Sequence, residues 1–193
     1  MKPVYALIIG LLAIVQYSNG QTDSTKKIFS KEFKWTISIP DNFENVKPED
    51  WAKMQNRGAE AIENTYDSKV TNRPKIIFVF KSGQFNYLEA NYQPFDPAVD
   101  GDYLESCKNV NEVLYQTFKK QMPGATIDTL TTVETIDNLE FQTSKMKIEY
   151  ANKLTMHLFT FSRLFGKREF SLNIMYMDES KGQLMLNSWK ESI

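Results

Sequence analysis

The sequence has little of what most catalytic and metal-binding sites are built from. Its 193 residues include one cysteine, Cys107, and one histidine, His157. Paired-histidine metal sites of the HExxH type are therefore excluded, and a zinc site would need unusual ligands. The phosphate-binding pattern GxxxxGK[ST], the dinucleotide pattern GxGxxG and the nucleophile pattern GxSxG are absent as well. We predict a protein that is not an enzyme and that holds no cofactor and no metal.

No apolar run in the sequence is long enough to predict a membrane span. The run Val4–Val15 is shorter than the ~20 residues that a hydrocarbon core requires. Lys2 precedes this run and a polar tail follows it, which is the layout of a secretory signal peptide. Ser18 and Gly20 are small residues placed three and one before Gln21. We therefore expect cleavage between Gly20 and Gln21, with a short retained anchor as the alternative.

These features predict a domain organisation and a cellular location. We expect a signal peptide over 1–20, a flexible lead-in over 21–30 and one domain over 31–193. The mature chain is then secreted or periplasmic, without stable membrane insertion after cleavage. A single cysteine cannot close an internal disulfide, so stability must come from the core. The formal charge of −1 argues against nucleic acid as a partner.

Hydrophobic periodicity predicts the elements of the first half. Alternation over 33–39 indicates a strand, and apolar residues at helical spacing over 51–66 indicate a helix opened by Pro48. The unbroken apolar run 76–80 predicts a strand buried on both faces, and the more polar segment 85–95 predicts an outer strand. A second helix begins at Asp102 and ends before Pro123-Gly124.

The second half predicts a meander of four strands and a last helix. Tight turns are expected at Asp137-Asn138, Ala151-Asn152 and Gly166-Lys167. The segments 154–165 and 170–176 carry large apolar side chains, and the last helix starts near Asp178. The predicted fold class is α+β, an α/β/α sandwich with a central antiparallel sheet and the order β-α-β-β-α-β-β-β-β-α.

This order and two local patterns resemble the Mog1/PsbP-like fold family. The patterns are FKWTISIP at 33–40 and FSLNIMY at 170–176, the second followed by a C-terminal helix that ends in Trp189-Lys190-Glu191-Ser192. The resemblance covers nearly all of the mature chain and implies a helix-covered antiparallel sheet. It also implies an accessory role in the bacterial envelope branch of the family. No functional residue of the family can be placed on this sequence.

Several residues are of types that can act in catalysis or bind a metal ion, but the sequence around each favours a structural role. Cys107 lies on an apolar helix stripe and is interpreted as a small buried hydrophobe, with a reactive or bridging thiol as the alternative. His157 shares a strand face with Phe159 and Phe161, and we interpret it as a structural histidine. The carboxylates in the segment DPAVDGDYLE could hold calcium, but turn and cap positions explain them: Asp96, Asp100, Asp102 and Glu105.

Basic residues around the predicted meander could form a small anion-binding patch, but we interpret them as a solvated sheet edge, where lysines also discourage edge-to-edge pairing. They are Lys145, Lys147, Arg163, Lys167 and Arg168.

Three functions from different classes follow. The first is an exported, non-catalytic accessory or protein-binding module whose partner is another envelope protein. It predicts an exposed aromatic patch that involves Phe85, Tyr87, Tyr92 and Phe95. The second is a carrier of a small ligand, with an aromatic-lined pocket between sheet and helix. The third is a carboxylate-dependent hydrolase that uses Asp100 and Asp102.

Overall fold

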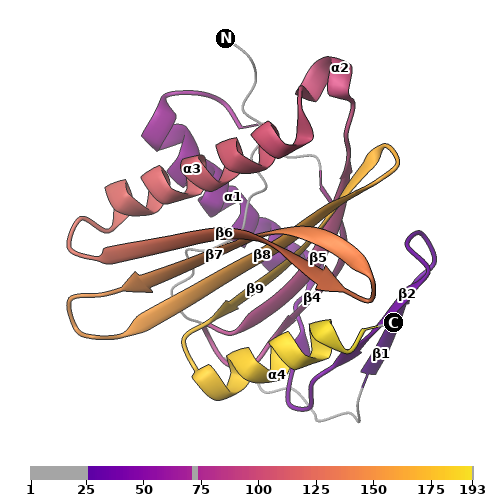
Figure 1. Cartoon of the computed structure of the whole chain (residues 1–193). Coiled ribbons are helices and arrows are strands. Elements are labelled where there is room, and N and C mark those ends of the chain that lie inside the picture. Colours follow the sequence, from indigo (N-terminus) through magenta and orange to yellow (C-terminus); the bar gives the residue numbers. More distant parts are fainter. Residues whose placement is uncertain (1–25, 71–73, 193) are drawn as a thin grey trace.

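A seven-stranded antiparallel sheet organises the chain (Figure 1). The computed structural model describes residues 26–70 and 74–192. The strands lie in the spatial order β3 (Glu44–Asn45), β4 (Lys75–Lys81), β5 (Tyr87–Pro94), β9 (Arg168–Tyr176), β8 (Thr155–Phe165), β7 (Leu139–Glu149) and β6 (Thr126–Ile136). Every neighbouring pair is antiparallel.

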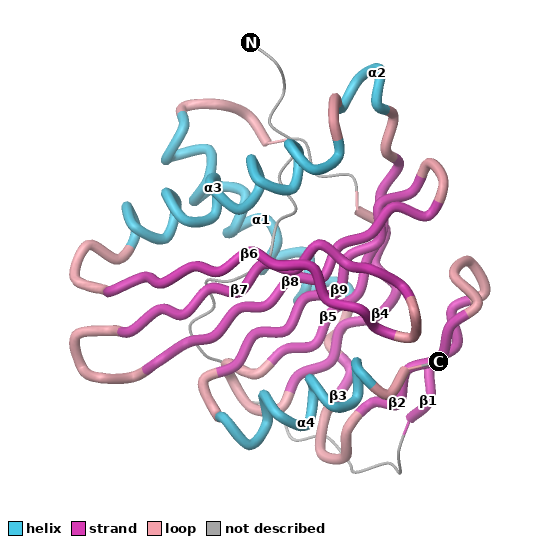
Figure 2. The backbone as a smooth tube through the Cα atoms, viewed as in Figure 1, coloured by secondary structure: helices cyan, strands magenta, loops and turns pink. Residues whose placement is uncertain are grey.

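Both faces of this sheet are covered. Helices α1 (Pro48–Tyr66) and α3 (Tyr103–Gln121) lie on one face, and the short α2 (Pro97–Asp100) leads into α3. On the other face, α4 (Glu179–Lys190) packs against β9 and against a separate hairpin. That hairpin consists of β1 (Lys26–Ser30) and β2 (Trp35–Ile39) and lies beside the C-terminal end of α4 (Figure 2). The predicted α/β/α sandwich is confirmed.

The two faces bury separate apolar cores, because side chains alternate along each strand. Phe161, Leu172 and Ile174 face α4 and the hairpin, together with Met185 and Trp189 of α4 itself. The opposite face packs against α1 and α3 through the residues Met146, Ile148, Met156, Leu158 and Met175. A sheet buried on both faces requires strands that are apolar on both sides, which β8 and β9 supply.

The meander β6–β9 and the last helix follow the prediction closely. The β6–β7 turn is Asp137-Asn138, with φ values of 46° and 59°, as the two central residues of a type I′ hairpin turn require. The β8–β9 turn is Gly166-Lys167. Asp178 begins α4 by accepting hydrogen bonds from the backbone N–H groups of Ser180 and Lys181.

Three expectations were wrong in the first half. Part of the expected lead-in is ordered as β1, whose residues 26–30 pair with β2; residues 21–25 lie outside the described part. The strand at 35–39 belongs to that hairpin and not to the main sheet. The segment expected as an outer strand is β5, which lies inside the sheet between β4 and β9. Its polar residues Glu89 and Asn91 are buried, which the hydrophobic pattern alone could not indicate.

Candidate functional site

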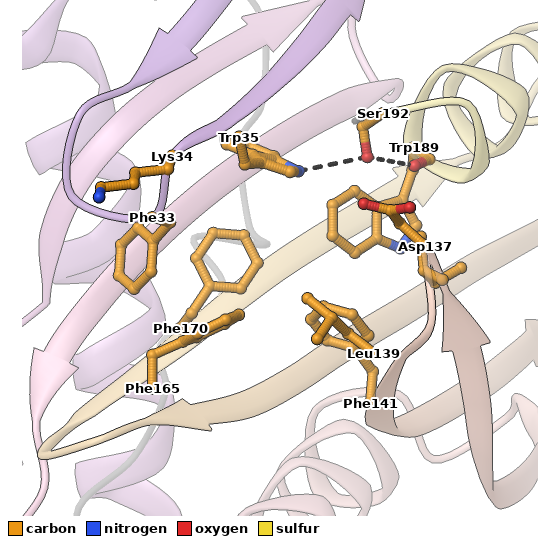
Figure 3. A pocket seen from close by; sticks show the side chains of 11 residues that line it. Phe33, Lys34, Trp35, Asp137, Leu139, Phe141, Phe165, Phe170, Trp189 and Ser192 are labelled. Atoms are coloured by element: carbon orange, nitrogen blue, oxygen red, sulfur yellow. Dashed lines mark hydrogen bonds between the residues drawn. The ribbon is translucent and has the colours of Figure 1, made fainter.

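An aromatic pocket lies at one end of the sheet, on the face that α4 covers (Figure 3). Its volume is about 80 Å³. Four separate parts of the chain build it: the β1–β2 hairpin, the β6–β7 hairpin, the β8–β9 hairpin and the end of α4. The lining residues are Phe33, Lys34, Trp35, Ile136, Asp137, Leu139, Phe141, Phe165, Phe170, Trp189 and Ser192.

Six of the lining side chains are aromatic, and they hold one another in place. Phe33 lies edge-on to Phe165 and Phe170, with ring centroids 5.2 Å and 5.1 Å apart. Trp189 lies edge-on to Phe141 at 5.2 Å and to Trp35 at 5.9 Å. Such pairs are favourable beyond the area they bury. The pocket wall is therefore a connected set of rings and not a loose group of side chains.

The pocket also has a few polar groups. The Trp35 indole Nε1–H donates to Ser192 Oγ over 3.2 Å, and Ser192 Oγ donates to the Trp189 carbonyl oxygen over 2.5 Å. The Trp189 indole Nε1 is buried and has no hydrogen-bond partner among the described residues. An unpartnered buried donor is costly.

Charges of both signs stand at the pocket rim. Lys34 and Asp137 are exposed, and both occupy the left-handed region, with φ values of 52° and 46°. Both residues lie in or beside the turns of their hairpins, which places them at the margin of the aromatic rings. The arrangement suits an apolar or aromatic group. It offers no nucleophile with an adjacent base.

The sequence analysis did not identify this pocket. Phe33, Trp35, Phe170 and Trp189 belong to the segments that carry the family resemblance, but nothing in the spacing shows that they meet. The usable signal was that two of the aromatic residues, Phe165 and Phe170, flank the predicted turn at Gly166-Lys167. A small-ligand pocket between sheet and helix was expected without any residues assigned to it.

The expected exposed aromatic patch is wrong. Tyr87 and Phe95 are buried, with 8% and 4% of their surface exposed. Tyr87 packs near Trp51 under α1, whereas Tyr92 lies on the other face, where its hydroxyl donates to Glu32 Oε1 over 2.7 Å. Phe85 is 38% exposed. Residues at odd and even positions of one strand face opposite sides, so these four side chains cannot form one patch.

The aspartate carboxylates of the segment DPAVDGDYLE accept hydrogen bonds from backbone N–H groups. Asp96 caps α2 by accepting from Ala98 N, and Asp102 caps α3 by accepting from Glu105 N over 2.9 Å. Asp100 accepts from the backbone N–H of Asp96 over 2.7 Å. Within 26–70 and 74–192, no group of three or more His, Cys, Asp or Glu side chains could hold a metal ion.

His157 packs in the sheet as a structural side chain would. Its ring stacks on Tyr176 with centroids 4.7 Å apart and planes inclined by 13°. Burial lowers the pKa of His157, against the opposing effect of the Glu179 carboxylate, whose oxygen lies 3.9 Å from Nε2. The neutral imidazole is favoured.

Four of the five basic residues considered above each interact with a different acidic residue or carbonyl oxygen. Lys145 pairs with Glu134 at 2.5 Å, Arg168 with Glu32 at 3.9 Å, and Lys147 with Glu149 at 4.0 Å. Arg163 donates to the Glu140 carbonyl oxygen over 2.6 Å. The partners are four different residues at separate positions, and the cations do not converge on one anion site. Lys167 occupies the exposed β8–β9 turn.

Cys107 faces the sheet from α3 and is half-buried. Burial raises the pKa of its thiol to about 11, which disfavours the nucleophilic thiolate. The predicted apolar stripe of this helix is confirmed, because Leu114 and Phe118 of the same stripe are buried against the sheet.

The expected cleavage site, Gly20 and Gln21, lies outside the described residues. Among the helices of the described residues, none combines the length and the apolar character that crossing a membrane would take.

Comparison with solved structures establishes the fold. Cyanobacterial PsbP (CyanoP) from Synechocystis sp. PCC 6803 superposes with a TM-score of 0.56 at 8% identity, covering 93% of this chain and 98% of that chain. LpqN, described as involved in cell envelope biogenesis of Mycobacterium tuberculosis, gives a TM-score of 0.44 at 11% identity, over 88% of this chain and 84% of that chain. This second likeness is too weak to support a conclusion.

No family model and no curated protein matches this sequence. The chain has the PsbP-like fold that the sequence resemblance implied. At this identity the likeness concerns the fold and carries no function with it.

Proposed function

We propose that this chain is an exported, non-catalytic binding module of the bacterial cell envelope, which takes an apolar or aromatic side chain of another envelope protein into its aromatic pocket. One observation carries the proposal. Six aromatic side chains from distant parts of the chain surround an open volume instead of closing over it, beside an indole N–H without a partner.

The position of the pocket supports a role in protein binding. It lies at the ends of three hairpins, where loops are exposed and can meet a second protein. Aromatic residues are enriched in the buried centres of protein interfaces, and charged groups are enriched at their rims. Lys34 and Asp137 stand at the margin of the six rings, so the site has both parts.

The absence of catalysis is supported by what the candidate groups do. Asp102 caps a helix, Asp100 accepts a backbone hydrogen bond, and His157 stacks in the sheet. None of them lines the aromatic pocket. The proposal that the protein is exported is supported only by the predicted signal peptide over residues 1–20.

Site-specific photocrosslinking tests the proposal. A photoreactive phenylalanine analogue replaces Lys34 at the rim, and a matched variant carries it at Leu154, which is 53% exposed in the β7–β8 turn. In cells that export the protein, we expect irradiation to give one discrete crosslinked protein from position 34 and none from position 154. Equal patterns from both positions would exclude the pocket as the binding site.

The second candidate function is a small-ligand carrier, favoured by the same enclosed aromatic lining. Native mass spectrometry of protein purified from its own host distinguishes the two functions. A carrier retains a small molecule of defined mass, whereas a protein-binding module gives the mass of the bare chain and depends on its partner for an occupant.

A further inference from the structure

A second cavity lies on the opposite face of the sheet, beneath the first half of α3. Its volume is about 100 Å³. The apolar contacts of α3 are made mainly by its second half, through Leu114 and Phe118. Under its first half the strands present a polar floor, composed of Thr131, Gln142, Ser144, Thr160, Ser162 and Glu169.

The hydroxyl protons of two floor residues, Ser162 and Thr160, are directed away from the cavity. Ser162 Oγ donates to Glu169 Oε1 over 2.9 Å, and Gln93 Nε2 donates to Glu169 Oε2 over 2.8 Å. Because Ser162 has a single proton, the 2.8 Å contact between Ser162 and Tyr103 must run from the Tyr103 hydroxyl to Ser162 Oγ. Ser162 therefore offers only lone pairs to an occupant of the cavity.

A second chain of hydrogen bonds has the same direction. Thr160 Oγ1 donates to Asn173 Oδ1 over 2.9 Å, and Asn173 Nδ2 donates to Glu89 Oε2 over 2.5 Å. Asn91 Nδ2 donates to the other oxygen of Glu89 over 2.6 Å. Thr160, which lines the cavity, is thus also turned with its lone pairs toward the open space. Two buried carboxylates thus orient Ser162 and Thr160 as acceptors.

These carboxylates have no positive counterpart. In the described part of the chain, neither Glu89 nor Glu169 forms an ion pair with a Lys, Arg or His side chain. Burial raises the pKa of Glu89 to about 7 and raises the pKa of Glu169, to which the Asp100 charge adds. A buried charge without a partner is expensive, and a cation in the cavity would stabilise Glu169, which lines it.

We propose that this cavity binds a small primary ammonium group, held by Glu169 and by the lone pairs of Thr160 and Ser162. The cavity is larger than a single metal ion needs, and an ammonium supplies three donors to the acceptors Glu169, Thr160 and Ser162. Lys108, which is exposed at the cavity wall, is the one lining cation and opposes the ligand. The site lies on the other side of the sheet from the aromatic pocket, so it does not depend on the proposed function.

The lone cysteine lets the charge preference be measured directly, because Cys107 lines this cavity. Methanethiosulfonate reagents transfer their tail to a thiolate with loss of methanesulfinate. The rate for the aminoethyl reagent, which carries an ammonium, is compared with the rate for the sulfonatoethyl reagent, and each is divided by its rate with free cysteine. We expect the ammonium reagent to be favoured by at least about tenfold, as the Coulomb energy of a nearby carboxylate predicts.

Matched variants assign this preference to the buried carboxylate. Glu169→Gln should abolish it, Lys108→Gln should increase it, and Glu105→Gln, an exposed change on the same helix, should leave it unchanged. Far-ultraviolet circular dichroism confirms that each variant is folded. Equal normalised rates, a preference that survives Glu169→Gln, or no reaction with either reagent would overturn the proposal.

A second experiment distinguishes a free small amine from the lysine side chain of a partner as the source of the ammonium group. Ethylammonium and the amide of N-acetyl-lysine are titrated separately, with tetramethylammonium, which has no N–H donor, as the control. Thermal stabilisation by ethylammonium alone indicates a free small amine, and stabilisation by both indicates that a lysine side chain of a partner can also enter. No stabilisation by either, or equal stabilisation by tetramethylammonium, contradicts the proposal.

Discussion

Gly182 of α4 lies flat against the ring of Tyr176 on β9: a Cβ atom at position 182 would fall 2.5 Å from Tyr176 Cδ2. The other face of the same ring stacks on His157. The glycine thus sets how closely the helix approaches the sheet.

Replacement of Gly182 by alanine should therefore destabilise the fold. Tyr176 is buried and cannot move aside freely, so overpacking should cost about 1–3 kcal/mol, more than the gain of about 1 kcal/mol in helix propensity. Gly124→Ala is the control, since nothing lies within 4 Å of a Cβ there. Urea unfolding measures both. A Gly182→Ala variant as stable as the parent would contradict the close approach.

The buried carboxylate of Glu89 should make stability depend on pH. Its pKa is about 7 in the folded chain against an ordinary 4.5, so between these values the folded chain retains a proton that the unfolded chain has lost. The contribution of this group to stability is therefore full below pH 4.5 and declines as the pH rises through 7, by roughly 3 kcal/mol at most.

Glu89→Gln removes this titration while keeping the shape of the side chain. Unfolding free energies measured at about pH 5 and about pH 8 should differ less for the variant than for the parent. Glu169 also has a raised pKa and contributes a slope in the same direction. A parent and a variant with the same slope would show that Glu89 does not titrate as described.

The hydrogen bond between Trp35 and Ser192 should couple the hairpin to the chain end. Ser192→Ala leaves the Trp35 N–H without its acceptor, which should cost about 1–3 kcal/mol. In a Trp35→Phe background, the same change should cost less, because no donor is left unpaired. A double-mutant cycle with equal costs in both backgrounds would rule out this coupling.

Sequence pattern predicted the elements that depend on local periodicity. The β6–β9 meander, its turns and the two long helices were identified because alternation, helical stripes and turn residues are properties of short segments. The start of the last helix near Asp178 was predicted for the same reason. These features need no knowledge of what lies on the other side of the sheet.

The interior place of β5 could not be predicted in this way. Glu89 and Asn91 made the segment look like an outer strand, yet they are buried because Asn173 on β9 supplies a hydrogen bond to Glu89. That partner is distant in sequence, and only the fold brings it near. The aromatic pocket escaped prediction similarly, because its rings come from four segments whose meeting depends on the packing of the β1–β2 hairpin against α4.

The indole N–H signals of the three tryptophans test the central claim, that the aromatic pocket admits an apolar or aromatic group. Trp189 and Trp51 both have buried indole nitrogens without a partner among residues 26–70 and 74–192, but Trp51 lies under α1 on the other face of the sheet. In a ¹H–¹⁵N titration with p-cresol, an analogue of the tyrosine side chain, we expect the Trp189 signal to shift saturably and the Trp51 signal to stay in place. Equal shifts of both signals, or no shift of the Trp189 signal up to the solubility limit of the probe, would contradict the account.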